Sequence, residues 1–188
     1  MDLEKVKLAL EANGITVFIV DNGAQAKQKV LELIPHGSEV MGMSSITLQQ
    51  IGLTDIDTVK KKLATMNRQT QNLEMQKMGT APEYTVGSVH AVTVDGKILI
   101  ASNTGSQLPA YVYGSPHVIW VVGQQKIVPT VDDGIKRIYD YILPLESARL
   151  SKAYGKDIKS FVSKLLIINR EINPTRLTMI LVKENLGF

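Results

Sequence analysis

Residues 84–129 read YTVGSVHAVTVDGKILIASNTGSQLPAYVYGSPHVIWVVGQQKIVP, and this stretch decides the fold. Its runs 89–94 and 97–101 are rich in β-branched and apolar residues, and they flank Asp95-Gly96. An Asp-Gly pair favours a two-residue hairpin turn of type I′, because both central positions of that turn require positive φ. The stretch therefore predicts two antiparallel strands joined by a tight turn.

A third run, residues 118–122, is continuously apolar and ends at Gly123. Such a run is typical of a strand buried on both faces, as in a parallel sheet, so we expect it at the centre of the sheet. Outside this stretch, helical and strand periodicities alternate, which predicts an α/β fold. The predicted helices lie within residues 3–13, 24–34, 46–51, 56–73 and 130–143, and the predicted strands lie at 15–20, 39–43, 165–168 and 177–181.

The sequence also predicts the length of one helix, the end of another and the pairing of the last two strands. Apolar residues and Thr70 recur at spacings of three and four over residues 56–73, which predicts one long helix. The helix that Thr130 caps is predicted to end at Pro144, since proline cannot continue a helix interior. The last two strands are predicted to pair antiparallel at a sheet edge, on either side of a turn at Asn173-Pro174.

Composition indicates an ordinary globular protein. The 188 residues are 44% hydrophobic and 21% charged, which suits a single domain over residues 1–188. The 21 basic and 18 acidic residues give a net charge of +3 and are spread along the chain, so we expect no nucleic-acid partner. No apolar run approaches the ~18 residues of a membrane span, and no signal peptide is recognised, so we expect a cytoplasmic protein without a membrane partner.

The chain contains no cysteine. This excludes disulfides, thiolate zinc sites, cysteine-ligated iron–sulfur clusters and a cysteine nucleophile. The histidines His90 and His117 lie at strand starts without the neighbours that a metal site needs, so we interpret them as structural. We expect neither a metal nor a cofactor.

The first candidate site is a loop of glycine and hydroxyl residues between a predicted strand and a predicted helix. It contains Gly42, Ser44, Ser45 and Thr47. Free backbone N–H groups and the positive end of a helix dipole can bind an anion at such a place. The alternative is that one serine only caps the helix, and the loop carries neither a Walker motif nor a dinucleotide-binding fingerprint.

The second candidate site is the polar loop that follows the hairpin. It contains Asn103, Thr104, Gly105 and Gln107, which is more polar side chains than a turn requires. Lys126 follows the predicted central strand, and ligands of open α/β sheets bind beyond the carboxyl ends of strands. Both loops and the lysine are candidates for binding a small anionic ligand, a carboxylate or a phosphate. The alternatives are an ordinary turn and a solvated lysine.

Two acids and the same lysine are the candidates for catalysis. Asp95 or Glu83 would act as a general base, and Lys126 would stabilise developing negative charge. Each has an alternative interpretation, since Asp95 suits the hairpin turn and Glu83 suits the rim of the molecule. Glu146 and Arg149 lie three residues apart, and we interpret them as a surface ion pair.

Three segments of the chain resemble the lactate-utilisation (LUD) domain family: GSEVMGMSSITLQQIGL (37–53), SVHAVTVDGKILIASNTGSQLPAYVYGSPHVIWVVGQQKIVP (88–129) with the following helix to Arg149, and NREINPTRLTMILVKENLGF (169–188). The resemblance implies a fold similar to the ribose-5-phosphate isomerase and coenzyme A transferase group. That fold is a three-layer α/β/α sandwich around a mainly parallel central sheet, here with a β-hairpin and antiparallel edge strands. In that group the glycine-and-hydroxyl loop holds an anionic substrate.

The family pattern extends over the second candidate site. It is similar to an acid-Gly turn, a Thr-Gly element and Gly-x-x-Lys-Ile-Val, which correspond here to Asp95-Gly96, Thr104-Gly105 and residues 123–128. The chain departs from the pattern at Asn103, where family members often have an acid, and at Gln125, where they often have asparagine. Well-described members are associated with oxidation of L-lactate to pyruvate, together with iron–sulfur proteins.

Three hypotheses follow. In the first, the protein is a ligand-binding or accessory component of lactate or organic-acid utilisation, acting with iron–sulfur partner proteins. In the second, it is a free-standing isomerase, transferase or hydrolase acting on a phosphorylated or coenzyme A-type substrate. In the third, it is a structural subunit that forms homo-oligomers through the helix predicted over residues 56–73.

Overall fold

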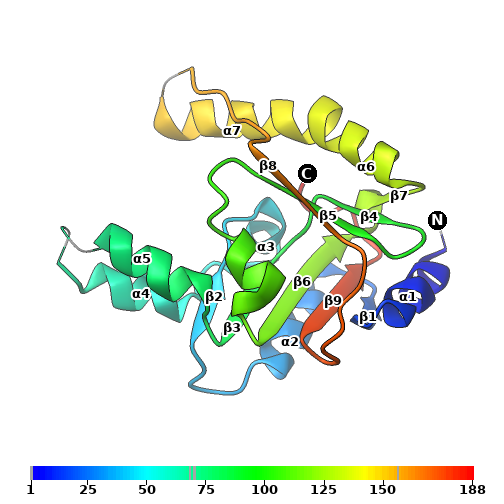
Figure 1. Ribbon diagram of the computed structural model, residues 1–188, viewed down its shortest axis with the longest axis horizontal. Helices are drawn as coiled ribbons and strands as arrows, with labels where there is room; N and C mark the ends of the chain where they lie inside the picture. The colour runs from blue at the N-terminus through cyan, green and yellow to red at the C-terminus, as the bar shows by residue number, and fades with distance from the viewer. Residues whose placement is uncertain (1, 68, 70, 156) are drawn as a thin grey trace.

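The computed structural model describes residues 2–67, 69, 71–155 and 157–188. Two β-sheets form the framework (Figure 1). The central sheet has the strand order β1-β9-β6-β3-β2, and all of its pairs are parallel. Its strands are β1 Thr16–Val20, β2 Val40–Gly42, β3 Tyr84–Gly87, β6 His117–Gly123 and β9 Leu177–Val182.

The smaller sheet has the order β7-β4-β5-β8 and is mixed. Its strands are β4 Ala91–Thr93, β5 Ile98–Ser102, β7 Ile127–Val128 and β8 Lys164–Ile168. Strands β4 and β5 pair antiparallel across a turn in which Gly96 has φ +81°, so the predicted hairpin is confirmed. The prediction for β6 is also confirmed, because it is the middle strand of the central sheet.

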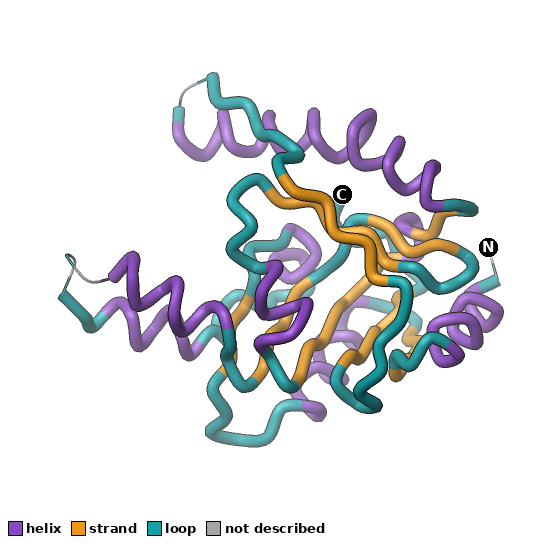
Figure 2. Tube along the Cα trace, in the orientation of Figure 1, coloured by secondary structure: helices purple, strands orange, loops and turns teal. Residues whose placement is uncertain are grey.

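Helices cover both sheets, and Figure 2 shows how they surround the strands. Short 3₁₀ and π turns interrupt or extend several of them. The α-helices are α1 Leu3–Ala12, α2 Gly23–Leu33, α3 Ile46–Gln50, α4 Thr58–Ala64, α5 Gln71–Thr80, α6 Val131–Arg137 and α7 Leu143–Tyr154. The remaining turns are the π-helices η1 Ala110–Gly114 and η3 Ile138–Ile142 and the 3₁₀-helix η2 Gln124–Lys126.

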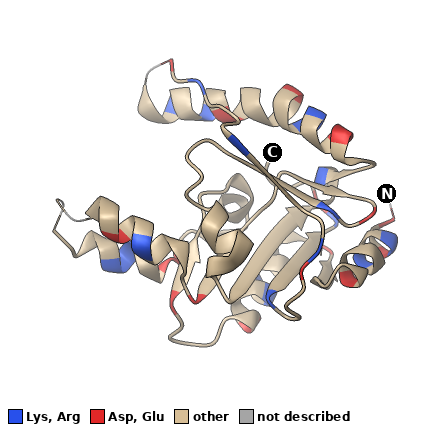
Figure 3. Ribbon diagram, viewed as in Figure 1, with Lys and Arg blue, Asp and Glu red and all other residues tan. Residues whose placement is uncertain are grey.

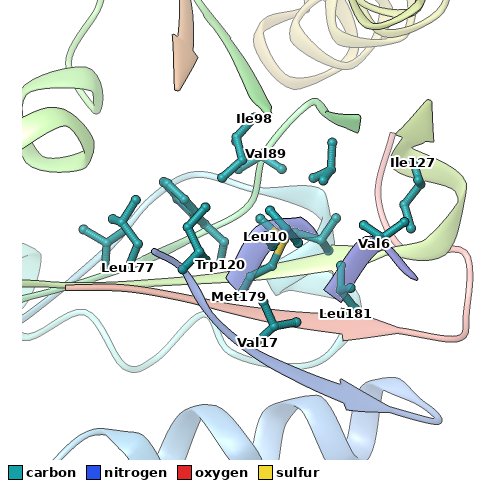
Figure 4. Close-up of a cluster of buried hydrophobic side chains, with 14 of the residues drawn as sticks. Val6, Leu10, Val17, Val89, Ile98, Trp120, Ile127, Leu177, Met179 and Leu181 are labelled. Carbon is teal, nitrogen blue, oxygen red and sulfur yellow. The ribbon is translucent and has the colours of Figure 1, made fainter. Parts of the chain in front are cut away.

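Two apolar clusters lie on opposite faces of the central sheet. One cluster joins α2 and α3 to the sheet through residues such as Val30, Leu48 and Ile180. The other joins α1 and the smaller sheet to the opposite face, and Figure 4 shows its labelled members, among them Leu10 and Trp120. A third cluster packs the outer side of the smaller sheet against α6 and η3. The fold is thus the expected α/β/α sandwich with a mainly parallel central sheet.

The long helix predicted over residues 56–73 is wrong. The structure has two helices there, α4 and α5, which contact each other. Asp57 caps the start of α4, and the Gln71 side chain donates to the carbonyls of Leu63 and Met66 at its end. Periodicity alone cannot detect such a reversal of the chain, because both helices keep the same spacing of apolar residues. Thr70, which was part of the predicted periodicity, lies outside the described residues.

The predicted helix end at Pro144 is also wrong. Helix α6 continues through the π-helical turn η3 into α7, which ends at Gly155 with φ +63°. Pro144 lies in the first turn of α7, where a residue without a backbone donor is tolerated, and the wider turn η3 precedes it. The capping box formed by Thr130 and Asp133 at the start of α6 confirms the predicted beginning.

The predicted pairing of the last two strands is wrong as well. Strand β8 pairs antiparallel with β5 at the edge of the smaller sheet, whereas β9 lies between β1 and β6 in the central sheet. The alternation of Leu177, Met179 and Leu181 suggested one buried face. The intervening residues of β9 are buried too, because the strand has a helical layer on one side and the smaller sheet on the other.

Charged residues lie mainly on the outer helices (Figure 3). Basic and acidic residues both occur on these helices, and most ion pairs of the described residues join residues three or four apart, such as Lys29 with Glu32 and the predicted pair of Arg149 with Glu146. In the described ranges, no helix has the length and apolar character needed to cross a membrane.

Candidate functional site at the carboxyl edge of the central sheet

Parallel strands place the segments that follow them at one edge of the sheet. Four such segments meet here, after β2, β3, β6 and β9, and they supply Thr47, Ser88, Lys126 and Leu186. Ligands of open α/β sheets bind at this edge. The topology therefore brings residues that lie up to 139 positions apart in sequence into direct contact.

Lys126 is the centre of this arrangement. It lies in η2, just after the central strand, and its side chain is buried, with 4% of its surface exposed. Its Nζ donates to Thr47 Oγ1 at 3.0 Å, to Ser88 Oγ at 3.0 Å and to the carbonyl of Val89 at 3.2 Å. A protonated lysine has three N–H donors, and all three have partners.

Among the residues that the structure describes, no carboxylate pairs with Lys126. The ion pairs of the described residues do not include Lys126, and its three acceptors are neutral oxygens. Burial, followed by the positive charge of Arg137, lowers the pKa of Lys126 to about 7. Burial and the charges of Lys126 and Arg137 lower the pKa of His90 to about 4, so this histidine is neutral at pH 7. The site is an electropositive region, and the described part of the chain supplies it with no acidic partner.

Of the four residues in the first candidate loop, Thr47 reaches the lysine. Thr47 is buried and also donates to the carbonyl of Leu186 at 3.3 Å. Ser45 caps α3 by accepting from the amide of Leu48 at 3.4 Å, as the alternative interpretation expected. Ser44 is exposed, and the amide of Gly42 donates to the carboxylate of Asp57 at 3.1 Å. The protein itself therefore uses the Gly42 amide that an anion would need.

The second candidate loop makes most of its hydrogen bonds within itself. Gln107 accepts from the hydroxyl of Ser102, which in turn accepts from the amide of Gly105. Thr104 bonds with Ser106, and Asn103 accepts from the hydroxyl of Ser163. Within the part of the chain that the structure describes, no hydrogen bond joins these residues to Lys126. The strand before the loop contacts His90, because the amide of Ala101 in β5 donates to His90 Nδ1 at 3.2 Å.

The two candidate acids lie away from the lysine. Glu83 is exposed and precedes β3, so it lies at the amino edge of the central sheet, opposite Lys126. Asp95 lies in the hairpin turn, where it accepts from the hydroxyl of Thr93 and forms an ion pair with Lys97 at 2.7 Å. These contacts, chiefly the hydrogen bond with Lys97, lower the pKa of Asp95. The structure brings neither acid to the site.

The last residues of the chain cover the lysine. Gln125 bonds with both the amide and the carbonyl of Leu186, and the amide of Gly187 donates to Gln50 at 2.7 Å. A Cβ added at Gly187 would lie 2.2 Å from Thr47 Oγ1 and 3.2 Å from Lys126 Nζ, so only glycine fits here. A surface groove of about 430 Å³ adjoins this segment, between the start of α2 and the end of α3.

Sequence reasoning missed three residues of the site: Ser88, His90 and Arg137. Ser88 follows a strand and a glycine, which is the signal that identified the first loop, so the same reasoning applied to β3 would have found it. His90 was interpreted as structural, and its contact with Ala101 agrees with that, but its position beside Lys126 depends on the pairing of β4 with β5 and β7. Arg137 has the signature of an ordinary helix-surface residue. In the described ranges, no three His, Asp or Glu residues gather as a metal site.

Comparisons with known proteins bear on the whole chain. A family model described as LUD domain matches residues 3–182. The comparison with curated proteins found no match. Among solved structures, the chain is similar to a DUF162 family protein from Deinococcus radiodurans, with 13% sequence identity and a TM-score of 0.54. The match covers 96% of this chain and 95% of that one, and at this identity it shows a shared fold.

Proposed function

The chain belongs to the LUD domain family, and from this premise we propose that it is a cytoplasmic component of lactate or organic-acid utilisation that binds a small organic anion beside Lys126. One observation carries the proposal. Lys126 is buried among hydroxyl and carbonyl oxygens and has no acidic partner among the described residues. A buried charge without a partner is costly, and an anion that replaces one of the weaker contacts would neutralise it.

The route to the lysine passes through the segment of residues 186–188. Its contacts over the site include the 3.3 Å hydrogen bond from Thr47 to Leu186 and the packing of Phe188 against the smaller sheet. Residues 186–188 belong to no strand, so a displacement of this segment would expose Lys126 and leave the central sheet intact. The ligand therefore enters from the side of the adjoining groove, whose lining includes Gln50 and Leu186.

Titration calorimetry tests this binding directly. The purified protein is titrated with L-lactate and pyruvate at pH 7 and constant ionic strength, alongside the Lys126→Met and Lys136→Met variants. Lys136 is exposed on α6, so its variant removes a positive charge outside the site. We expect binding by the wild type and by Lys136→Met and a loss of at least tenfold in affinity in Lys126→Met. Equal binding by all three proteins would contradict the proposal.

The accessory role predicts partners. Because the chain has no cysteine, the iron–sulfur clusters associated with this family's lactate oxidation would be carried by other proteins. Affinity purification from the native cell should recover iron–sulfur proteins, and the isolated chain should not oxidise lactate. Turnover of lactate by the isolated chain would contradict the accessory role.

A free-standing enzyme remains the second candidate, because the pKa of Lys126 at about 7 is near neutral. An amine of this kind can transfer a proton or stabilise negative charge during turnover of a phosphorylated or coenzyme A-type substrate. With Asp95 and Glu83 elsewhere, Lys126 is the candidate that remains for this role. Turnover of such a substrate by the isolated protein, abolished in Lys126→Ala, would favour the enzyme over the accessory component.

A further inference from the structure

The guanidinium group of Arg137 has two N–H donors that form no hydrogen bond with the described residues. It is the last residue of α6, and its guanidinium lies over the ring of Tyr141 at 4.9 Å. Its Nε and Nη2 atoms are buried and have no hydrogen-bond partner among the described residues. A buried donor without a partner costs roughly 1–3 kcal/mol, and more when it is charged, so a native structure that keeps two of them side by side requires an explanation.

The position of Arg137 gives that explanation. Helix α6 packs closely on the smaller sheet at Gly134, where an added Cβ would lie 2.9 Å from Leu99 and 3.3 Å from Ala91. Arg137 lies one helical turn beyond Gly134 and so on the same side of the helix, beside the segment that carries His90. The same segment carries Val89, whose carbonyl accepts from Lys126 Nζ at 3.2 Å, so α6 and Lys126 both adjoin residues 89–91. The positive charge of Arg137 lowers the pKa of both His90 and Lys126, in keeping with this arrangement.

Two cations, Arg137 and Lys126, adjoin residues 89–91 without an acidic partner among the described residues. Neither Arg137 nor Lys126 takes part in an ion pair of the described residues, and His90 supplies no negative charge. A monocarboxylate would neutralise one of these two charges and leave the other without an acidic partner. Nε and Nη2 together form the side-on fork that binds two oxygens of one carboxylate or phosphate group.

We propose that Arg137 and Lys126 bind the ligand together, Arg137 through Nε and Nη2, and that this ligand is a dianion, either a phosphate monoester or a dicarboxylate. The inference rests on the anion-binding function proposed above and narrows its ligand class. It makes Arg137 the residue that selects a doubly charged ligand over a monocarboxylate. The two sources of the dianion share the same charge and differ in the arrangement of their oxygens.

Titration calorimetry at pH 7 with methyl phosphate, malonate and L-lactate distinguishes the possibilities. We expect at least one dianion to bind tenfold or more tightly than lactate, and the tighter of the two identifies the source. Arg137→Gln should lower dianion affinity by at least tenfold and remove the preference over lactate. Arg137→Lys keeps the charge without the fork and should recover part of the affinity, whereas Lys136→Gln should match the wild type.

The outcomes separate the two proposals. If lactate binds as tightly as the dianions, or if Arg137→Gln keeps the preference, the inference about Arg137 is overturned while anion binding stands. If none of the three probes binds the wild type, both proposals fail. If Arg137→Gln does not fold, as judged by circular dichroism, the dianion affinity of Arg137→Lys is compared with that of the wild type. An affinity equal to that of the wild type would then overturn the inference.

Proton uptake gives a second readout that a purely structural arginine would not change. At pH 8 the free site holds Lys126 mostly neutral, with Arg137 and His90 as the other titratable groups that face it. A dianion stabilises the protonated lysine, so binding should take up a proton. Calorimetry in two buffers of different ionisation enthalpy measures this uptake. A wild type that binds without uptake would contradict the joint contact with Lys126.

Discussion

Lys126 illustrates how one residue can be held in a state that water would not favour. Its ammonium group has three neutral acceptors and no acid, and burial disfavours its charged form. The unfolded chain exposes the same lysine to water, where its pKa is 10.5. Between the two pKa values, the unfolded state binds more protons than the folded state, so stability rises with pH there.

The first prediction concerns this pH dependence. The free energy of unfolding of the wild type should rise between pH 7 and pH 10.5 relative to that of Lys126→Met, by about 1.4 kcal/mol per pH unit. Urea denaturation of both proteins at several pH values measures the difference. Parallel curves over this range would show that Lys126 has an ordinary pKa.

The second prediction concerns His90. Its pKa of about 4 lies below the value of 6.5 in the unfolded chain, so the wild type should lose about 1.4 kcal/mol per pH unit as pH falls from 6.5 to 4. His90→Asn keeps a side-chain oxygen as acceptor for the Ala101 amide and should lack this component. The control is His36→Asn, which changes an exposed histidine. We expect this variant to lose stability in acid as the wild type does. If the free energy of unfolding falls with pH equally in the wild type and in His90→Asn, this prediction is wrong.

Some residues of the candidate site can be predicted from the sequence, and others cannot. Lys126 and Thr47 can be found because each follows a predicted strand next to a glycine, and the geometry brings them together. Arg137 cannot be found in this way, since its role depends on how α6 packs on the smaller sheet. Glu83 and Asp95 were plausible bases by residue type alone, and only the direction of the strands separates them from the lysine.

Single elements depend on side chains from elsewhere in the chain. Arg176, just before β9, donates to the carbonyls of Tyr111, Val112 and Ser115, which belong to or follow η1. It also forms a buried ion pair with Glu171 at 2.8 Å. This arginine therefore supplies hydrogen bonds to the end of a π-helix that has no capping side chain at its start.

The third prediction follows from Arg176. Replacing it with Met leaves Glu171 as a buried charge and removes the donors at the end of η1, so the free energy of unfolding should fall by about 3–5 kcal/mol. Arg170→Met, at an exposed position in the same loop, should change it by about 0.5 kcal/mol or less. Chemical denaturation of the three proteins measures this difference. A loss in Arg176→Met no larger than in the control would contradict the assigned role.

Local signals predicted elements well where the cause is local. The Asp95-Gly96 turn and the cap formed by Thr130 and Asp133 depend on neighbouring residues only. The helix predicted over residues 56–73 failed because the chain reverses without a glycine or proline. The end predicted at Pro144 failed because η3 widens the helix immediately before the proline.

At the scale of the whole molecule, the segment of residues 186–188 covers the candidate site. The segment of residues 186–188 lies on Thr47 and Lys126, and Gly187 has φ +71°. Gly155 has a similar φ of +63°, but an added Cβ there would meet nothing within 4 Å. The two glycines therefore share the same backbone strain and differ in what lies above them.

The fourth prediction uses this difference. Gly187→Ala should displace the covering segment and expose Lys126, because its Cβ would overlap the hydroxyl of Thr47. The rate of reductive methylation of Lys126 at pH 8, followed by mass spectrometry, should rise by at least tenfold. Gly155→Ala carries the same strain and should leave the rate unchanged. Equal rates in both variants would show that the segment does not control access.

The topology also shows where sequence reasoning reaches its limit. The central position of β6 could be inferred from its apolar run. Strand β9 was predicted at an edge because the alternation of Leu177, Met179 and Leu181 indicated only one buried face, whereas both faces are buried. Which strands become neighbours depends on contacts between segments remote in sequence. The pairing of β1 with β9 joins Thr16 to Thr178 and has no local signal.

That pairing has a consequence during synthesis. Because β9 lies between β1 and β6, the ribosome must release residue 182 before the central sheet can close. Until then a nascent chain exposes the paired edges of both strands, and such edges are templates for other polypeptides. A fragment that stops before residue 177 would therefore expose the edges of β1 and β6 and would be prone to aggregate.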